Sequence, residues 1–190
     1  VEKAATLTSK RQTRIPLPHA LFGAERANSQ GPDMNDKPTL DELRSAIARS
    51  TRVSYSAAPL IGGRPVRGVN KPICSPSDHR DLVGQVIEAT AAHASAAMAL
   101  THAAFPAWSA TPASERADIL DGAADLLQGR LPELLALIVR EGGRTQSDAV
   151  AEVREAIDFC RYYAAQARKK FAEPILLPGP TGERNSLTLH

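Results

Sequence analysis

The chain has 190 residues, of which 43% are apolar and 23% charged, enough for one globular domain with its own core. Its 23 lysines and arginines are interleaved with 21 aspartates and glutamates, so the formal net charge is +2 and nothing points to nucleic acid. Two cysteines without a CxxC pattern argue against a disulfide framework and a zinc site. No apolar run approaches the roughly 20 residues that cross a bilayer, and the start VEKAATLTSKRQ lacks the apolar region of a signal peptide. We therefore expect a cytoplasmic protein, and the initial Val1 suggests a chain that begins inside a longer reading frame.

Residues 1–58 are polar and broken by four prolines, which is typical of a connector that lies outside the core. One short helix is expected over residues 40–50, where Leu40, Leu43 and Ile47 recur at helical spacing behind Thr39 as the N-cap. The connector's charged side chains are expected in solvent: Arg14, Arg26 and Arg52.

Short β pieces are expected at two places, near residues 60–70 and 184–190. The glycines and prolines of residues 59–76 favour a small hairpin or edge strands that lead into a loop. At the other end, the alternation of polar and apolar residues predicts the first strand of a hairpin whose partner strand is missing. The segment GPTGE at 179–183 has no phosphate-binding spacing, so we expect a turn.

Helical structure is expected from near Asp81 almost to Pro174. An Ala-rich helix over residues 89–105 should stop at Pro106 and leave Trp108 in the break. The next helix should follow Thr111 as its N-cap, with Pro112 as its first residue, and end at Gly129.

Two further helices complete the predicted set. One begins at Pro132 and should close at the Gly142-Gly143 pair with a left-handed cap. The other follows Ser147 and should bury one continuous seam, made of Val150, Val153, Ile157, Cys160, Ala164, Ala167 and Phe171. The fold class is therefore mainly α with short β pieces.

The order AFPAW, SERADILDGAADLL, VREGGRTQSDAVAEV and REAIDFCRYYAAQAR resembles the N-terminal helices of aldehyde dehydrogenases, and more narrowly the L-glutamate γ-semialdehyde (pyrroline-5-carboxylate) dehydrogenase branch. Two flanks sharpen the resemblance to bifunctional proline utilisation A proteins. Residues 15–34 resemble the connector after their proline dehydrogenase domain, and residues 177–187 resemble the approach to their nucleotide domain. One departure is Glu141-Gly142-Gly143-Arg144-Thr145, where the family usually has Glu-Ala-Gly-Lys-Thr; it keeps both the charge and the glycine.

This resemblance implies a division at residue 58. Residues 1–58 would be the connector, and residues 59–190 an incomplete N-terminal part of the aldehyde dehydrogenase (NAD-binding) domain of an α/β fold. The parent would oxidise proline with FAD and the semialdehyde with NAD, and both cofactors would bind outside this chain. The family's catalytic Gly-Gln-x-Cys motif does not occur in these residues, so we expect no catalytic residue and no activity from the chain alone. The expected partners are the remainder of the parent and other copies of it, and peripheral membrane association of the parent stays open.

For each residue that could serve catalysis, metal binding or substrate binding, a packing role is the alternative. Cys160 on the apolar seam and Cys74 in a proline-rich loop favour packing over catalysis. The five histidines share no ligand spacing, so no metal is expected. The spacing of Phe159, Tyr162 and Tyr163 favours core positions over an aromatic cage.

Glu155 is the one candidate for a substrate contact. In semialdehyde dehydrogenases this helix flanks the aldehyde access, so the resemblance implies that Glu155 meets the substrate ammonium. Glu152 lies nearby, and the simpler alternative for these carboxylates is a solvated charge beside Arg154 or Arg161.

Three hypotheses for the whole chain stay open at this point. The first is part of a bifunctional proline-catabolic enzyme; the second is a non-catalytic helical interaction or scaffold module derived from an aldehyde dehydrogenase; the third is part of a monofunctional dehydrogenase. The coding text on either side of this frame would distinguish them. In isolation the helices should leave a large apolar face uncovered, which predicts aggregation or a molten state.

Overall fold

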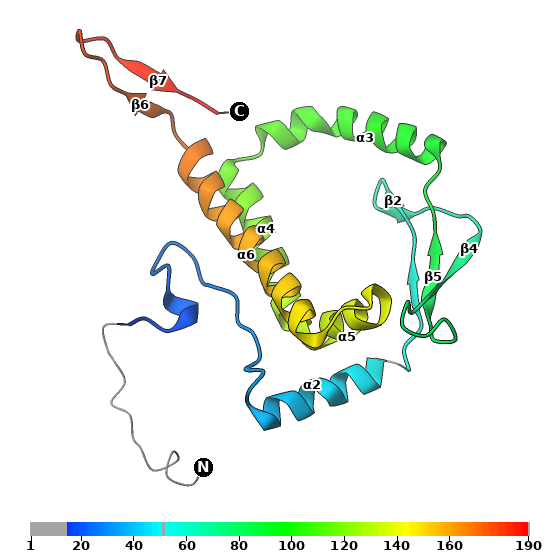
Figure 1. The fold of residues 1–190 in the computed structure, drawn as a ribbon. Coiled ribbons are helices and arrows are strands. Elements are labelled where there is room, and N and C mark those ends of the chain that lie inside the picture. Colours follow the sequence, from blue (N-terminus) through cyan, green and yellow to red (C-terminus); the bar gives the residue numbers. More distant parts are fainter. Residues whose placement is uncertain (1–14, 51, 190) are drawn as a thin grey trace, which may run out of the picture.

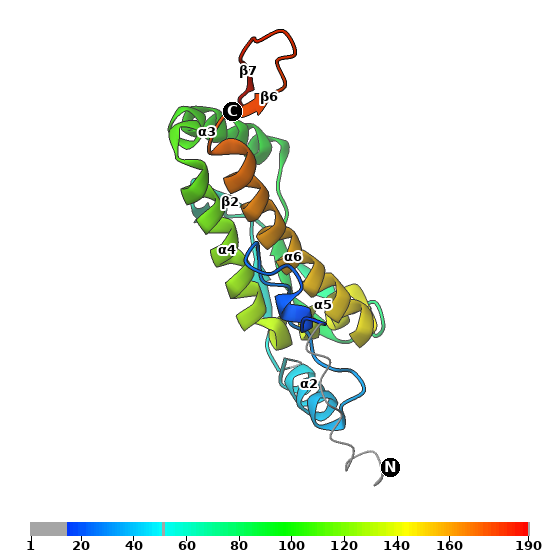
Figure 2. The same ribbon diagram turned by 90° about the vertical axis from the view of Figure 1, so that its left-hand side faces the viewer.

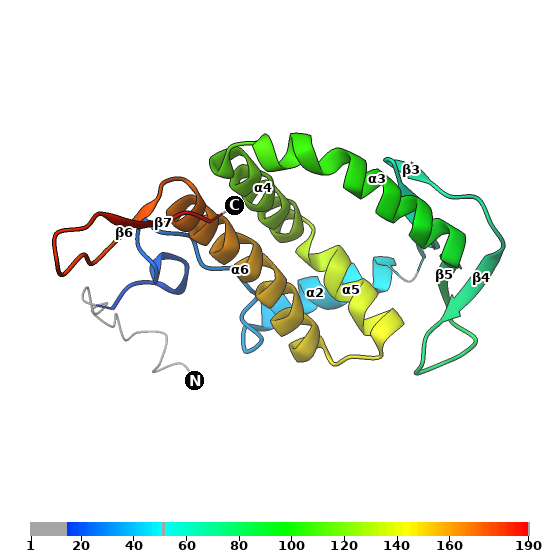
Figure 3. The ribbon, with the colours of Figure 1, turned by 90° about the horizontal axis from the view of Figure 1, so that it is seen from above.

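The computed structural model describes residues 15–50 and 52–189. A helical body and a small sheet lie at opposite sides of an open, angular arrangement, and one long helix connects them (Figure 1). Seen from the side the molecule is elongated (Figure 2), and both turned views show a hairpin projecting beyond the helices near the C-terminus (Figures 2 and 3).

Helices dominate the chain, as the sequence predicts. In the part of the chain that the structure describes, a short 3-10 turn η1 (Pro18–Ala20) is followed by the α-helices α2 (Lys37–Ser50), α3 (Ala91–Ala110), α4 (Ala113–Gly129), α5 (Leu131–Gly142) and α6 (Gln146–Phe171). The strands are β1 (Tyr55–Ala57), β2 (Leu60–Ile61), β3 (Arg64–Pro65), β4 (Asn70–Cys74), β5 (Leu82–Ile87), β6 (Ile175–Leu177) and β7 (Asn185–Leu187).

The core lies where α4, α5 and α6 meet. Helices α4 and α6 lie side by side (Figures 1 and 2). They approach closely because the side chains of Ala117, Ala124 and Ala164 are small, and all three are fully buried. Leu135 of α5 and Ile157 of α6 are the largest aliphatic side chains in this core, at 1% and 0% exposed. Burial of each contributes about 1.5–3 kcal/mol to folding.

Helix α6 buries the predicted seam over most of its length. The seam is buried at Val150, Val153, Ile157 and Ala164, and Cys160 packs against the same cluster. At its far end the seam stops, because Phe171 is 39% exposed. The αL conformation of Gly143 (φ 62°) closes α5 as predicted.

Helix α2 corrects the expectation that the connector stays outside the core. It packs against α5, and Leu43 is only 5% exposed within the main apolar cluster. Its start also differs from the prediction, because the Asp36 carboxylate accepts hydrogen bonds from the Thr39 backbone N–H (3.1 Å) and hydroxyl (2.6 Å). Asp36 is therefore the capping side chain, and Thr39 lies inside the first turn.

Strand β5 corrects the expectation that helical structure begins near Asp81. It is the centre of a three-stranded sheet, parallel to β1 and antiparallel to β4. β-branched Val83 and Val86 suit a strand, and Gly84 is required by close approach, since a Cβ there would lie 2.3 Å from the Tyr55 carbonyl oxygen. Strand β4 ends at Cys74, so this residue lies on a strand and not in the predicted loop.

Two hairpins flank the helices. β2 and β3 pair antiparallel around Gly62 and Gly63, whose φ angles of 60° and 74° fit a two-residue turn, so the predicted first hairpin is confirmed. The terminal hairpin differs from the prediction: β7 has its partner within the chain, because it pairs antiparallel with β6. The GPTGE segment forms the predicted turn, in which the Gly182 N–H donates to the Gly179 carbonyl (3.1 Å).

Helix α3 runs through Pro106, where the sequence predicted a stop, and Trp108 lies within it. The hydroxyl of Thr111 donates to the Ala107 carbonyl (3.1 Å) and so completes the last turn of α3, and Pro112, not Thr111, precedes α4. None of the 20 residues of α3 is buried, so the His102 carbonyl that loses its partner at Pro106 lies on an exposed turn where water can satisfy it. Large apolar side chains along α3 and α4 stay exposed, among them Met98, Phe105, Trp108, Ile119 and Leu126.

Candidate functional site

One face of α6 carries an exposed stripe made of Glu155, Phe159 and Tyr163. These residues recur at i, i+4 and i+8, which places them one above another on a helix. Phe159 and Tyr163 are 51% and 57% exposed, and their ring centroids lie 6.1 Å apart. Tyr162 is 40% exposed and meets Tyr163 edge to face at 5.2 Å. The expectation of core positions for these three rings is therefore wrong.

The Glu155 carboxylate lies at one end of this stripe. It is exposed, and it makes no hydrogen bond or ion pair within the described part of the chain. Glu152 differs, because its carboxylate lies 3.1 Å from the Arg144 Nε. An available carboxylate next to aromatic faces can attract an ammonium group by charge and by cation–π contact.

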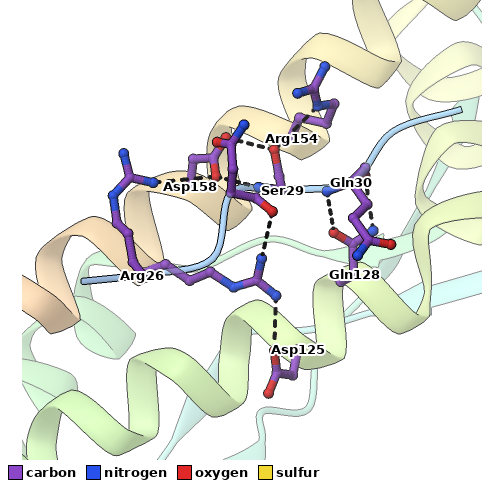
Figure 4. Close-up of polar contacts among 9 residues, drawn as sticks. Arg26, Ser29, Gln30, Asp125, Gln128, Arg154 and Asp158 are labelled. Atoms are coloured by element: carbon purple, nitrogen blue, oxygen red, sulfur yellow. Dashed lines mark hydrogen bonds and ion pairs between the residues drawn. The ribbon is translucent and has the colours of Figure 1, made fainter. Parts of the chain in front are cut away.

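A neighbouring face of α6, which carries Arg154, Asp158 and Arg161, holds residues 26–30 in what we call the N-terminal joint (Figure 4). Ser29 is 2% exposed, and its backbone N–H and hydroxyl donate to the two Asp158 carboxylate oxygens at 2.7 and 2.6 Å. The Arg154 Nε donates to the Ser29 Oγ at 3.2 Å, and Arg161 pairs with Asp125 of α4 at 3.1 Å. Both arginines are thus engaged in the joint, and neither pairs with Glu155.

A second pair of contacts attaches the joint to α4. The Gln30 backbone N–H donates to the Gln128 side-chain oxygen (2.9 Å), and the Gln128 amide donates back to the Gln30 carbonyl (3.0 Å), as Figure 4 shows. Because one segment bonds to both helices, the joint fixes α4 and α6 relative to each other. It supplies positioning and no nucleophile.

Arg26 belongs to the joint, against the expectation that it is solvated. Its side chain is 13% exposed, its guanidinium carbon lies 3.6 Å from the centre of the Phe22 ring, and its Nη1 lies 3.7 Å from the Asp158 Oδ1. The aromatic ring shields the pair from water. Arg52 is exposed as expected, and Arg14 lies outside the described residues.

A buried arginine connects the helices to the sheet. Arg140 of α5 is 5% exposed, and its Nε and Nη2 donate to the two Asp81 carboxylate oxygens at 3.1 and 2.7 Å. Its guanidinium also donates to the carbonyls of Val53 and Leu82, each at 3.3 Å. The hydrogen bonds from Arg140 lower the pKa of the Asp81 carboxyl, and the same bonds raise the pKa of Arg140.

Among the described residues, neither cysteine nor any histidine builds a reactive cluster. Cys160 and Cys74 are free thiols and half-buried, and Cys160 packs against the core, which fits a packing role. Within residues 15–50 and 52–189 no three His, Cys, Asp or Glu side chains come together as metal ligands. His93 has a structural task, since its Nδ1 accepts from the Thr90 N–H at 3.2 Å at the start of α3. In the same ranges no helix combines the length and apolarity that crossing a bilayer requires.

Comparison with known proteins shows which family this chain belongs to. Residues 67–189 match the model of the aldehyde dehydrogenase family. The chain belongs to the aldehyde dehydrogenase family. The bifunctional protein PutA of Rhizobium meliloti is 41% identical over 175 residues, which is 89% of this chain and 14% of that protein. The 1-pyrroline-5-carboxylate dehydrogenase of Anoxybacillus flavithermus is 39% identical over 127 residues, 66% of this chain and 24% of that protein.

A solved structure agrees with these relatives. A crystal structure of a proline utilization A variant from Bradyrhizobium japonicum superposes with a TM-score of 0.67 at 40% identity, and covers 93% of this chain and 15% of that one. The predicted resemblance to bifunctional proline utilisation proteins is thus confirmed over most of this chain. The chain spans about one seventh of the length of the PutA relatives that it matches.

Sequence reasoning named Glu155 as a candidate, and it missed the Ser29–Asp158 and Arg140–Asp81 contacts. The Ser29 and Asp158 pair is 129 residues apart in the chain, and Arg140 and Asp81 are 59 apart, so no local spacing indicates either contact. The only local signal was the i, i+4 spacing of Arg154 and Asp158 on one face of α6. The predicted division at residue 58 and the substrate role of Glu155 stay predictions.

Proposed function

We propose that this chain is a part of an NAD-dependent L-glutamate γ-semialdehyde (1-pyrroline-5-carboxylate) dehydrogenase within a bifunctional proline-catabolic enzyme. Residues 1–58 would connect to a proline dehydrogenase that uses FAD, and residues 59–190 would begin the NAD-binding domain. The 41% identity to a PutA protein over 89% of the chain supports this assignment.

The observation that carries the proposal is that one face of α6 is held by polar contacts while another face stays exposed. Asp158 of this helix is bonded to Ser29, and Arg161 is paired with Asp125 of α4. Another face of the helix presents Glu155 with Phe159 and Tyr163 to the outside. A rigid helix with an available carboxylate is suited to orient a substrate that carries an α-ammonium group. Glu155 would therefore bind substrate and take no part in hydride transfer.

NAD and FAD would be held by residues outside this chain. The glycine-containing turn at 179–183 closes on itself, since a Cβ on Gly179 would lie 1.8 Å from the Glu183 carbonyl oxygen, and its sequence lacks a phosphate-binding spacing. Bound NAD would accept the hydride, and this chain would contribute substrate binding and the helical support of the domain. In keeping with the family, the parent would act as a cytoplasmic homo-oligomer.

The test is steady-state kinetics of the complete enzyme that contains this chain, with the semialdehyde varied at saturating NAD. Glu155→Gln should raise KM by about tenfold, because a hydrogen bond to a charged group contributes roughly 1.5–3 kcal/mol, and should leave kcat nearly unchanged. Glu152→Gln is the matched control, because Glu152 pairs with Arg144.

The results separate two failures. Equal KM values for the two variants would remove the substrate role of Glu155 and leave the assignment of the enzyme intact. Absence of NADH production by the complete wild-type enzyme would overturn the assignment itself. The 190-residue chain alone should produce no NADH, and turnover by it would contradict the expectation that the reactive groups lie elsewhere.

A further inference from the structure

Arg26, which precedes the helices in the chain, lies against an aromatic side chain of α6. Its guanidinium carbon is 3.6 Å from the centre of the Phe22 ring and 5.8 Å from the centre of the Tyr162 ring. Both distances are within the roughly 6 Å at which a cation is attracted to the face of an aromatic ring. Tyr162 is 40% exposed, so the core restrains this ring only in part. Arg26 therefore adds a restraint on the orientation of Tyr162.

The position of Arg26 is fixed in turn by the N-terminal joint. Its Nη1 lies 3.7 Å from the Asp158 Oδ1, and Asp158 accepts two hydrogen bonds from Ser29 (Figure 4). The Nη1 atom is buried and has no hydrogen-bond acceptor, so the aromatic faces and the Asp158 charge offset its loss of water. The Asp158 carboxylate also balances the positive charge of Arg26, which weakens any repulsion of an ammonium group that binds nearby.

The contacts continue from Tyr162, ring by ring, into the exposed stripe of Glu155, Phe159 and Tyr163. The centroids of the Tyr162 and Tyr163 rings are 5.2 Å apart, with an interplanar angle of 75°. The Phe159 ring follows, with its centroid 6.1 Å from that of Tyr163. Glu155 lies one turn before Phe159 on α6. The three rings form one connected group, so the orientation of Tyr162 constrains the two rings beside Glu155.

We propose that Arg26 is a positioning residue of the semialdehyde site. Through Tyr162 it holds the two rings beside Glu155 in the orientation that receives the substrate's ammonium group. The inference rests on the proposed function, in which the exposed stripe binds that group. Exposed aromatic side chains otherwise occupy more than one χ1 rotamer, and ordering them during binding reduces affinity. Arg26 orders the rings beforehand and does not itself touch the substrate.

The test is steady-state kinetics of the complete enzyme that contains this chain, with the semialdehyde varied at saturating NAD. Arg26→Met should raise the KM for the semialdehyde by about three- to tenfold, because the rings lose their restraint, and should leave kcat within about twofold of wild type. Arg26→Lys retains the cation and should recover part of this change. The matched control is Arg52→Met, the same change at an exposed arginine, and it should leave both constants unchanged.

A second variant tests the path through the Tyr162 ring. Tyr162→Leu removes a half-exposed ring and should raise the KM to a similar extent. Addition of Arg26→Met to Tyr162→Leu should then raise the KM little further, because Arg26 acts through the ring that is already absent. A merely structural role of Arg26 predicts a different result. It would lower the amount of folded enzyme, and hence the apparent kcat, and leave the KM unchanged.

The outcomes separate this inference from the proposed function. The inference is overturned alone if Arg26→Met leaves the KM unchanged, if its loss is confined to kcat, or if its effect on KM is equal with and without the Tyr162 ring. Should Arg26→Met fail to fold, a wild-type KM in Tyr162→Leu overturns it. Absence of NADH formation by the complete wild-type enzyme would overturn the proposed function and the inference together.

Discussion

Truncation of Ile157 to alanine tests whether the contact of α4, α5 and α6 is the true core of this chain. The side chain is 0% exposed in the middle of α6. Three carbon atoms are lost, which at about 0.8 kcal/mol per buried methylene corresponds to roughly 2.4 kcal/mol. The alanines that surround the site allow little collapse, so the cavity left behind should raise the loss of unfolding free energy to about 3–4 kcal/mol.

The matched control is the same change at Ile119 on α4, which is 58% exposed. It removes the same atoms from a helix of the same body, but most of them already lie in water. The expected loss is below about 0.5 kcal/mol. Alanine also has the higher helix propensity, which acts in favour of both variants equally.

Urea titration followed by far-UV circular dichroism measures the comparison, because the transition midpoint shifts with stability when its slope is unchanged. Ile157→Ala should lower the midpoint strongly and Ile119→Ala hardly at all. Equal shifts for the two variants would refute the packing described for α6. A loss of the cooperative transition in the wild-type chain would instead support the expected molten state.

Two further predictions concern the polar anchors. The pKa of Asp81 is lowered in the folded chain, so its contribution to stability is present above about pH 4 and is lost as the pH falls through the lowered value. The variant Asp81→Asn should therefore be less stable than the wild-type chain at neutral pH. In urea titrations at decreasing pH, the difference in unfolding free energy between the two should become smaller. Ser29→Ala should destabilise the chain by about 1–2 kcal/mol, because Asp158 loses a hydrogen bond to a 2% exposed partner, and amide hydrogen exchange should then speed up at residues 26–30 before it does in α5. Unchanged exchange at residues 26–30 would contradict the role of the joint.

Local patterns were sufficient for the elements that local chemistry determines. The seam of α6 follows from helical spacing, and Gly143 follows from the need for a left-handed residue after α5. The two-glycine turn of the first hairpin likewise carries its own signal. Such features depend on residues a few positions apart, so one sequence contains the information.

Features that depend on distant partners were missed. Strand β5 forms because it pairs with β1 and β4. The need for glycine at residue 84 becomes visible only from its close approach to the Tyr55 backbone. The candidate site shows the same limit: the aromatic residues around Glu155 have core-like composition, yet they lie on the face of α6 away from α4. Hydrophobic periodicity predicts that a helix has faces, but not which neighbour covers each one.

The lack of any buried residue in α3 has a consequence for the order in which the chain acquires structure. A helix of 20 residues without a buried residue is held mainly by its own backbone hydrogen bonds, by the side-chain bonds at its two ends and by a small contact with β2. We therefore expect the α4–α6 body, which buries the core, to be more stable than α3. In a larger enzyme of this family, α3 would therefore be among the last segments to settle, which makes it the natural place for assembly to be delayed or regulated.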